Sequence, residues 1–194
     1  MRNLRALLIP MALVASLPAL ATDTYVIDAT HSEVSFKIRH LLAKVSGRFT
    51  KYQGTILIDE KNHQNSSVEV SIEVASINTD NETRDKHLRS ADFFEAEKFP
   101  KMTFKSTGVR EVEKGKLEIT GDLTLHGVTK KFTFPITNAG TQPGKEPGSA
   151  VAGFIDGALR LNRNEFGIKY GPGMLGDEVD ISLNVEARKA APKP

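Results

Sequence analysis

The chain has 194 residues, enough for one domain with a sizeable core, and its lack of cysteine excludes disulfides, thiol chemistry and thiolate metal sites. Its formal charge of +2 matches the contribution of Arg2 and Arg5, because without them 24 basic residues balance 24 acidic ones. A neutral chain with no basic block gives no reason to expect nucleic acid as a partner.

The first 21 residues have the pattern of a secretory signal peptide. Arg2 and Arg5 precede an apolar run over 6–17, and small residues at 19 and 21 fit a cleavage site. The run is shorter than the roughly 20 residues that a bilayer requires, and it contains Pro10. We therefore expect residues 1–21 to be removed and residues 22–194 to form one periplasmic domain without permanent membrane insertion.

Apolar and polar residues alternate with a period of two through most of the remaining chain, which is typical of strands with one buried face. Turn-forming segments separate these stretches. The predicted strands, in chain order, cover residues 30–40, 54–59, 67–74, 101–106, 116–125, 130–136, 150–161 and 177–187.

Successive strands with short connections pair antiparallel, and about eight of them with one apolar face must close or stack. Gly121, Gly153 and Gly157 lie inside the strand patterns, where glycine often marks a bend at a barrel corner. The predicted fold is therefore all-β, an antiparallel up-and-down barrel with a short helical insert, and a two-sheet sandwich is the alternative.

The insert is the long connection over residues 77–100. Asp80 and Asp92 are each predicted to cap a short helical segment. The stretch RDKHLRSADFFEAEKFP, residues 84–100, combines the densest charge of the chain with three phenylalanines. Function often resides in such connections, so this insert is the first candidate region.

Catalytic and metal-binding motifs are nearly absent. There is no G-x-S-x-G, and the five histidines show neither H-x-H nor H-E-x-x-H spacing. Spacing alone leaves open a metal site assembled from distant strands. The stretch GPGMLG, residues 171–176, matches G-x-G-x-x-G but joins no strand to a helix, so it predicts a glycine-rich turn. We expect no enzyme, no metal and no cofactor.

The inward face of a barrel of this size either fills the interior or encloses one small ligand. We predict a ligand cavity, and the alternative is a packed core made of the same side chains. The predicted cavity-lining residues are Val34, Phe36, Ile38, His40, Phe49, Val70, Ile72, Phe93, Phe94, Phe99, Met102, Phe104, Leu123, Leu125, Phe132, Phe134 and Phe166.

Charged residues of the insert are candidates for a polar rim. Arg84, His87 and Arg89 lie beside the predicted cap, where they would contact an anionic or polar head group of a lipid. In the alternative interpretation the insert is a solvated loop whose charges pair with its own carboxylates. His40 lies on an apolar face, so it either bonds a neighbour or orients a ligand.

The sequence resembles the YceI-like, polyisoprenoid-binding periplasmic proteins. The resemblance spans nearly the whole mature chain through the motifs DATHSEVSFKIRHLL, GRFTKYQGTI, INTDNETRDKHLRSADFFEAEKFPKMTF, GDLTLHGVTKKFTF and NRNEFGI. It implies a lipocalin-like barrel whose elongated cavity binds an isoprenoid chain of the polyprenyl phosphate or quinone type, for carriage or storage. It implies no established enzymatic activity.

Two other functions remain open at this level. The cavity would be structural in a stress-related interaction protein, and an enzyme on a small apolar substrate would use His40 with a carboxylate that the sequence does not place there. A homodimer is compatible with the barrel edges and the PGKEPG loop, residues 143–148, although nothing in the sequence requires one.

Overall fold

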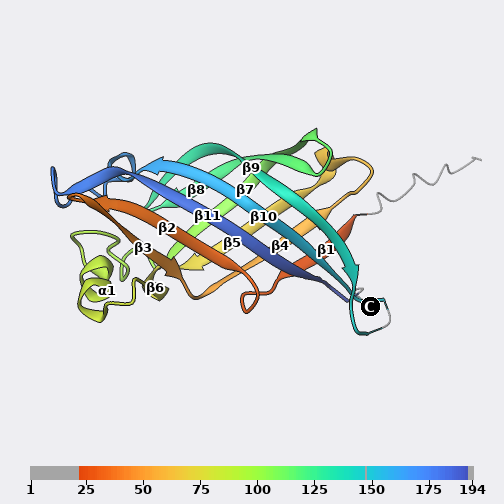
Figure 1. The fold of residues 1–194 in the computed structure, drawn as a ribbon, viewed down its shortest axis with the longest axis horizontal. Helices are drawn as coiled ribbons and strands as arrows, with labels where there is room; N and C mark the ends of the chain where they lie inside the picture. The colour runs from red at the N-terminus through yellow and green to blue at the C-terminus, as the bar shows by residue number, and fades with distance from the viewer. Residues whose placement is uncertain (1–21, 147, 192–194) are drawn as a thin grey trace, which may run out of the picture.

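A ring of antiparallel strands forms the wall of the molecule (Figure 1). The computed structural model describes residues 22–146 and 148–191, so the predicted signal peptide, residues 1–21, lies outside the described residues. The strands are β1 (Asp23–Ile27), β2 (Glu33–His40), β3 (Ala43–Phe49), β4 (Tyr52–Ile58), β5 (Ser67–Glu73), β6 (Ile77–Asn78), β7 (Lys101–Glu113), β8 (Lys116–Leu125), β9 (Val128–Pro143), β10 (Ala150–Asn162) and β11 (Leu175–Lys189). The helical elements are η1 (His63–Asn65), η2 (Val74–Ser76), α1 (Glu82–Arg89) and η3 (Arg163–Phe166).

The ring closes through the two ends of the chain. The pairing order is β1-β4-β5-β7-β8-β9-β10-β11, and β11 pairs back to β1 from Tyr25↔Lys189 to Ile27↔Ala187. Each of these pairings is antiparallel. The predicted eight-stranded antiparallel barrel is confirmed.

Three short strands that the alternation did not predict complete the up-and-down order. The C-terminal part of β11 pairs with β1, and its N-terminal part pairs with β2, so β1 and β2 follow one another along one edge of β11. In the same way β3 continues into β4, and β5 continues through η2 into β6. Each of the first three wall strands is thus interrupted once, and the prediction missed β1, β3 and β6 because each is short or sparse in apolar residues.

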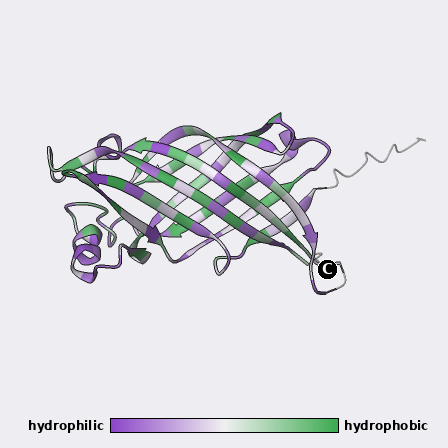
Figure 2. Ribbon diagram, in the orientation of Figure 1, coloured by the Kyte–Doolittle hydropathy of each residue, from purple (hydrophilic) through white to green (hydrophobic). Residues whose placement is uncertain are grey.

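Hydrophilic and hydrophobic residues alternate along the wall strands (Figure 2). The apolar set forms the buried clusters and the cavity wall, so it faces the interior. One cluster of buried side chains packs at the end of the barrel opposite α1. This cluster consists of Tyr25, Ile58, Val109, Leu117, Ile119, Phe134, Ile136, Ala152, Phe154 and Ala187. The barrel is therefore closed by packing at that end.

Glycines in the strands allow close approach and bending, as the sequence predicts for this fold. A Cβ at Gly121 would overlap the ring of Phe104 on the neighbouring strand. The pairing of β10 shifts register between Phe154 and Gly157, which marks a bulge there. The wall curves at this point of β10.

The insert contains one helix instead of two helical segments. Asn81, and not Asp80, caps α1 by accepting a hydrogen bond from Arg84 N at 2.9 Å. Asp80 itself adopts a left-handed backbone with φ of 57°. Residues 91–98 form turns, so the predicted cap at Asp92 starts no helix. In the described part of the chain, no helix has the length and hydrophobicity needed to span a membrane.

Candidate functional site

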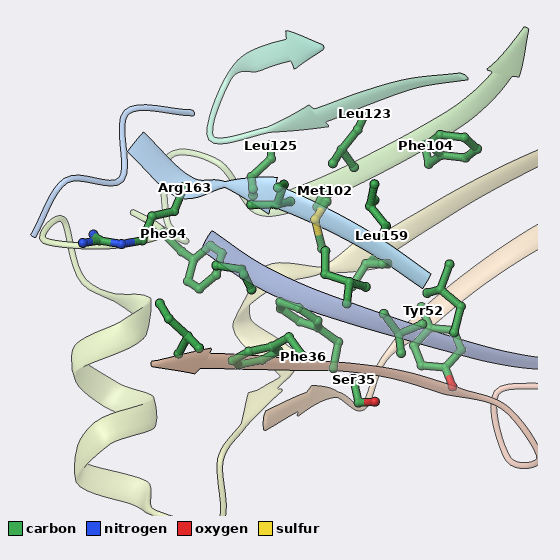
Figure 3. A pocket seen from close by; sticks show the side chains of 18 of the residues that line it. Ser35, Phe36, Tyr52, Phe94, Met102, Phe104, Leu123, Leu125, Leu159 and Arg163 are labelled. Carbon is green, nitrogen blue, oxygen red and sulfur yellow. The ribbon is translucent and has the colours of Figure 1, made fainter. Parts of the chain in front are cut away.

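A cavity of about 520 Å³ runs through the interior of the barrel, from α1 to the buried cluster at the opposite end, and Ile119, Phe134, Ile136 and Phe154 of that cluster line it (Figure 3). Its wall is almost entirely hydrocarbon, with polar side-chain atoms from only Ser35, His40, Tyr52, Thr79, Arg84, His87, Arg163 and Tyr170 among the described residues. A volume of this size lies within the range of about 300–1,000 Å³ typical of small-molecule sites. The arrangement favours an apolar ligand with a single polar end.

Most residues predicted to line a cavity lie on its wall. They are Val34, Phe36, Ile38, His40, Phe49, Val70, Ile72, Phe93, Phe94, Met102, Phe104, Leu123, Leu125 and Phe134. The period-two alternation of each strand places these side chains on the concave face of the sheet.

Three predicted lining residues lie elsewhere, which corrects that part of the prediction. Phe166, in η3, is fully buried and stacks on the ring of Phe132, with centroids 6.1 Å apart. The ring of Phe99 packs against the imidazole of His126, with ring centroids 4.6 Å apart. These rings fix η3 and the insert to the barrel wall, because His126 Nδ1 also hydrogen-bonds Phe166 O at 2.9 Å.

The mouth of the cavity lies between α1 and the loop over residues 167–174. Of the described lining residues, only His87, Tyr170 and Met174 are exposed. The rings of His87, Tyr170 and Phe93 lie 5.0 Å from one another in a three-way contact. Aromatic pairs at this separation attract one another beyond their buried area. The contact therefore connects the two sides of the mouth.

Helix α1 presents two of the three predicted head-group residues to the cavity. Arg84 donates from Nε to Thr79 Oγ1 and from Nη2 to Thr79 O, each at 2.7 Å. His87 hydrogen-bonds Asp92 at 2.9 Å through Nε2. Arg89 does not line the cavity, because it lies about 200° around the helix from His87 and donates instead to Ala75 O.

His40 lies on the cavity wall at the end of β2, near the mouth. No hydrogen bond joins its imidazole to another described residue. The nitrogen atoms are thus free to contact a ligand that reaches this level of the cavity.

The sequence analysis missed Arg163, a buried cation that organises the mouth. Its side chain is 4% exposed and donates to Gly176 O, Ile168 O and Tyr170 O at 2.7–2.9 Å. Burial lowers the pKa of Arg163, while Asp177, 3.5 Å away, opposes that shift. Figure 3 shows the guanidinium turned away from the labelled apolar side chains. Arg163 therefore holds the loop after η3 in place. The sequence could not predict this role, because a single arginine after an alternating strand matches no motif.

Many of the remaining lining residues that the sequence analysis missed come from β10, β11 and the loop between them. They include Phe154, Leu159, Leu161, Ile168, Tyr170, Met174, Leu175, Val179, Ile181, Leu183 and Val185. The sequence predicted both strands, but only the closed ring shows which of their side chains face open space. The other lining residues that the sequence analysis missed are Ile27, Ser35, Val45, Tyr52, Ile56, Val68, Thr79, Leu88, Ile119 and Ile136.

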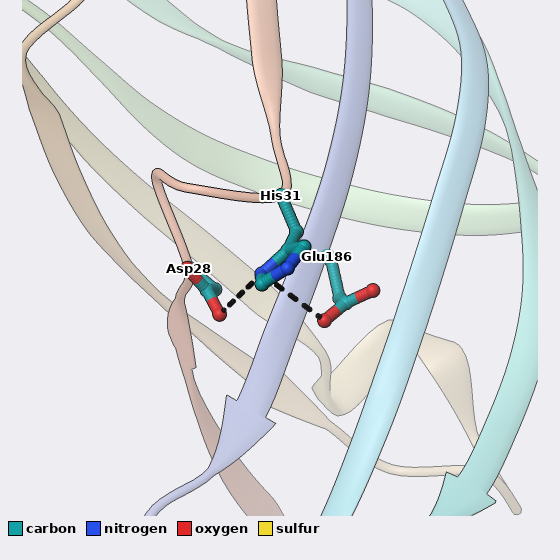
Figure 4. A group of neighbouring side chains, drawn as sticks. All are labelled: Asp28, His31 and Glu186. Atoms are coloured by element: carbon teal, nitrogen blue, oxygen red, sulfur yellow. Dashed lines mark hydrogen bonds and ion pairs between the residues drawn. The ribbon is translucent and has the colours of Figure 1, made fainter.

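A cluster of Asp28, His31 and Glu186 lies at the break between β1 and β2 (Figure 4). Hydrogen bonds from His31 and Arg188 hold the pKa of Asp28 well below its ordinary value, although burial opposes this. Arg188 Nη2 lies 2.7 Å from the Asp28 carboxylate, so a cation of the protein already pairs with this carboxylate. We therefore interpret the cluster as a structural clamp, in which Asp28 joins the segment between β1 and β2 to Arg188 on β11, and not as a metal centre.

The domain model described as YceI-like domain matches residues 25–187 of the chain. The chain belongs to the YceI-like family. Its curated relatives include UPF0312 proteins of Vibrio parahaemolyticus, 40% identical over 97% of this chain and 98% of the relative, and of Pseudomonas savastanoi, 40% identical over 95% and 96%.

Solved structures show the same YceI-like fold. Burkholderia cenocepacia BcnA is 26% identical with a TM-score of 0.74, covering 82% of this chain and 98% of that protein. The Campylobacter jejuni YceI protein is 33% identical with a TM-score of 0.71, covering 80% and 91%. A polyisoprenoid-binding domain from Saccharophagus degradans is 16% identical with a TM-score of 0.65, covering 86% and 98%, and this likeness concerns the fold alone.

Proposed function

We propose that this YceI-like barrel binds an isoprenoid or a similar long-chain lipid, of the polyprenyl phosphate or quinone type, and carries or stores it in the periplasm. The observation that carries the proposal is the hydrocarbon-lined cavity of about 520 Å³, open beside α1 and closed by packing at the other end. The name of the Saccharophagus degradans domain, which shares the fold, points to the same ligand class. The N-terminal signal-peptide pattern supports the periplasmic location.

The energetics favour recognition of the tail. Burial of one CH₂ group contributes about 0.8 kcal/mol, so an isoprene unit of about five carbons contributes about 4 kcal/mol. Association costs roughly 4–15 kcal/mol, so a few buried units suffice for stable binding. Apolar area along the barrel therefore sets the affinity, and individual polar contacts set the orientation.

The polar end of the lipid would lie at the mouth. Thr79, Arg84 and His87 belong to the insert beside the opening, and His40 approaches from β2. Away from the mouth the described lining residues are apolar apart from Ser35 and from Tyr52, whose hydroxyl already donates to Ser32 O, and none of them is exposed. A charged head placed there would lose its hydration without a partner, so the tail enters first.

A variant whose cavity is filled by larger side chains tests the proposal. Leu159 and Ile181 are cross-strand partners on the cavity wall, whereas Ala158 and Ser182 are cross-strand partners with exposed side chains on the outer face. The double substitution Leu159→Trp and Ile181→Trp adds two adjacent indoles that project from this wall into the cavity. Ala158→Trp with Ser182→Trp adds the same rings to the same strands without entering it.

Native mass spectrometry and solvent extraction of each purified protein measure the bound lipid. We expect lipid in the wild type and in the outer-face control, and a strong loss in the filled variant at similar melting temperature. A wild type purified without lipid, whose melting temperature no long-chain lipid raises, would contradict the proposal and favour a structural cavity.

A further inference from the structure

The mouth of the cavity carries exposed apolar side chains on two neighbouring turns. Leu41 and Leu42, at the tip of the β2–β3 turn, are 55% and 104% exposed, and Tyr170 and Met174, in the loop before β11, are 42% and 38% exposed. Leu41 N donates to Met174 O at 2.8 Å, which joins the two turns. We call these four residues the rim.

The rim is continuous with the cavity. Tyr170 and Met174 line the cavity and are exposed at the same time. A hydrocarbon chain that leaves the cavity between α1 and this loop therefore meets apolar surface before it meets water.

The charges next to the rim are positive. The segments 39–44 and 167–176 contain Arg39, Lys44 and Lys169 and no carboxylate. Within the described residues, neither Arg39 nor Lys169 has a carboxylate within ion-pair distance, whereas Lys44 pairs with Asp180 at 2.9 Å. Acidic residues next to these segments have partners of their own, because Asp92 bonds His87, Asp177 lies 3.5 Å from Arg163, and Glu178 accepts a hydrogen bond from Asn162.

We propose that the rim docks on an anionic phospholipid bilayer. Leu41, Leu42, Tyr170 and Met174 would insert at the level of the head groups, while Arg39 and Lys169 contact lipid phosphates. Apolar side chains beside Lys and Arg are the combination that interfacial anchors use. The inference rests on the proposed function, since docking would place the mouth against the membrane that donates or accepts the lipid.

A bilayer fits the rim better than a protein partner or a second copy. The four exposed apolar side chains of the rim belong to the β2–β3 turn and to the loop before β11. Turn tips penetrate a fluid head-group layer, whereas a stable protein interface needs about 800 Å² of complementary surface from each partner.

The test compares Leu41→Ser with Leu42→Ser against Val112→Ser with Ile155→Ser. Val112 and Ile155 are 48% and 42% exposed, lie on β7 and β10, and are neither rim residues nor lining residues. Co-sedimentation with vesicles of phosphatidylcholine and phosphatidylglycerol measures docking, and native mass spectrometry measures bound lipid. Transfer of that lipid to acceptor vesicles is followed in parallel.

We expect the rim variant to lose vesicle affinity by about tenfold or more and to transfer lipid more slowly, with unchanged lipid content, while the control variant behaves like the wild type. Added salt, or vesicles of phosphatidylcholine alone, should weaken wild-type binding. Equal binding of all three proteins would overturn the inference. A wild type that dimerises through the rim would overturn it in favour of a second copy. A wild type that carries no bound lipid but still binds vesicles, with the rim variant impaired, would contradict the proposed function and support docking through the rim.

Discussion

Replacement of the buried Arg163 by methionine tests how the mouth is built. The guanidinium donates three hydrogen bonds to the carbonyls of Gly176, Ile168 and Tyr170, and its side chain is almost inaccessible to water. Each carbonyl left without a donor costs about 1–3 kcal/mol if it stays buried. Relief of the desolvation of the charge offsets part of this loss. We expect the free energy of unfolding to fall by about 2–4 kcal/mol, a large part of the stability of an ordinary domain.

Urea unfolding of a chain of residues 22–194 measures this change, and Arg160→Met is the matched control. Arg160 lies three residues earlier, near the end of β10, is exposed and pairs with Asp180, so its loss should cost less than about 1 kcal/mol. Because Arg163 positions the loop that carries Tyr170, the same variant should also release bound lipid faster. An unfolding free energy for Arg163→Met within 1 kcal/mol of the control would refute the reasoning.

Three further predictions follow from local geometry. Gly121→Ala should lower the melting temperature, at a cost of about 1–3 kcal/mol, because the new methyl group overlaps Phe104, whereas Gly108→Ala has open space around it and should be neutral or slightly stabilising. Asp28 has a depressed pKa in the fold, so its contribution to stability is present above the unfolded value of about 3.9 and disappears as the pH falls through the folded value. In the Asp28→Asn variant the melting temperature should fall less steeply as the pH is lowered below about 4. An unchanged pH dependence would contradict a stabilising role for the Asp28 cluster. His87→Ala removes the ring contact across the mouth and should speed lipid exchange with little change in melting temperature. Unchanged exchange in a stopped-flow transfer assay would show that this contact does not limit access.

The alternation of apolar residues determined much of the wall. Residues such as Phe36 and Phe104 are predicted inward by period two alone, and both line the cavity. The insert was recognisable as the element beside the mouth because its phenylalanines and charges interrupt that period. The number of wall strands followed from the same pattern.

Alternation could not reveal how the barrel closes. Strand β1 has five residues, and it pairs with residues 187–189 near the other end of the chain. No local signal links segments so far apart. The role of Arg163 is similar, because its partners are backbone carbonyls whose positions depend on the path of the following loop.

The sequence by itself determined which side chains face inward, because the two-residue period of a strand assigns each residue to one face. Only the tertiary structure decided that these side chains leave space between them instead of filling it. A solid core and a lined cavity use the same residue types, and they differ in the separation of opposite walls, which ring closure sets. Phe132 and Phe134 illustrate the point, since they lie on one face of β9, yet the ring of Phe132 stacks on Phe166 and only Phe134 lines the cavity.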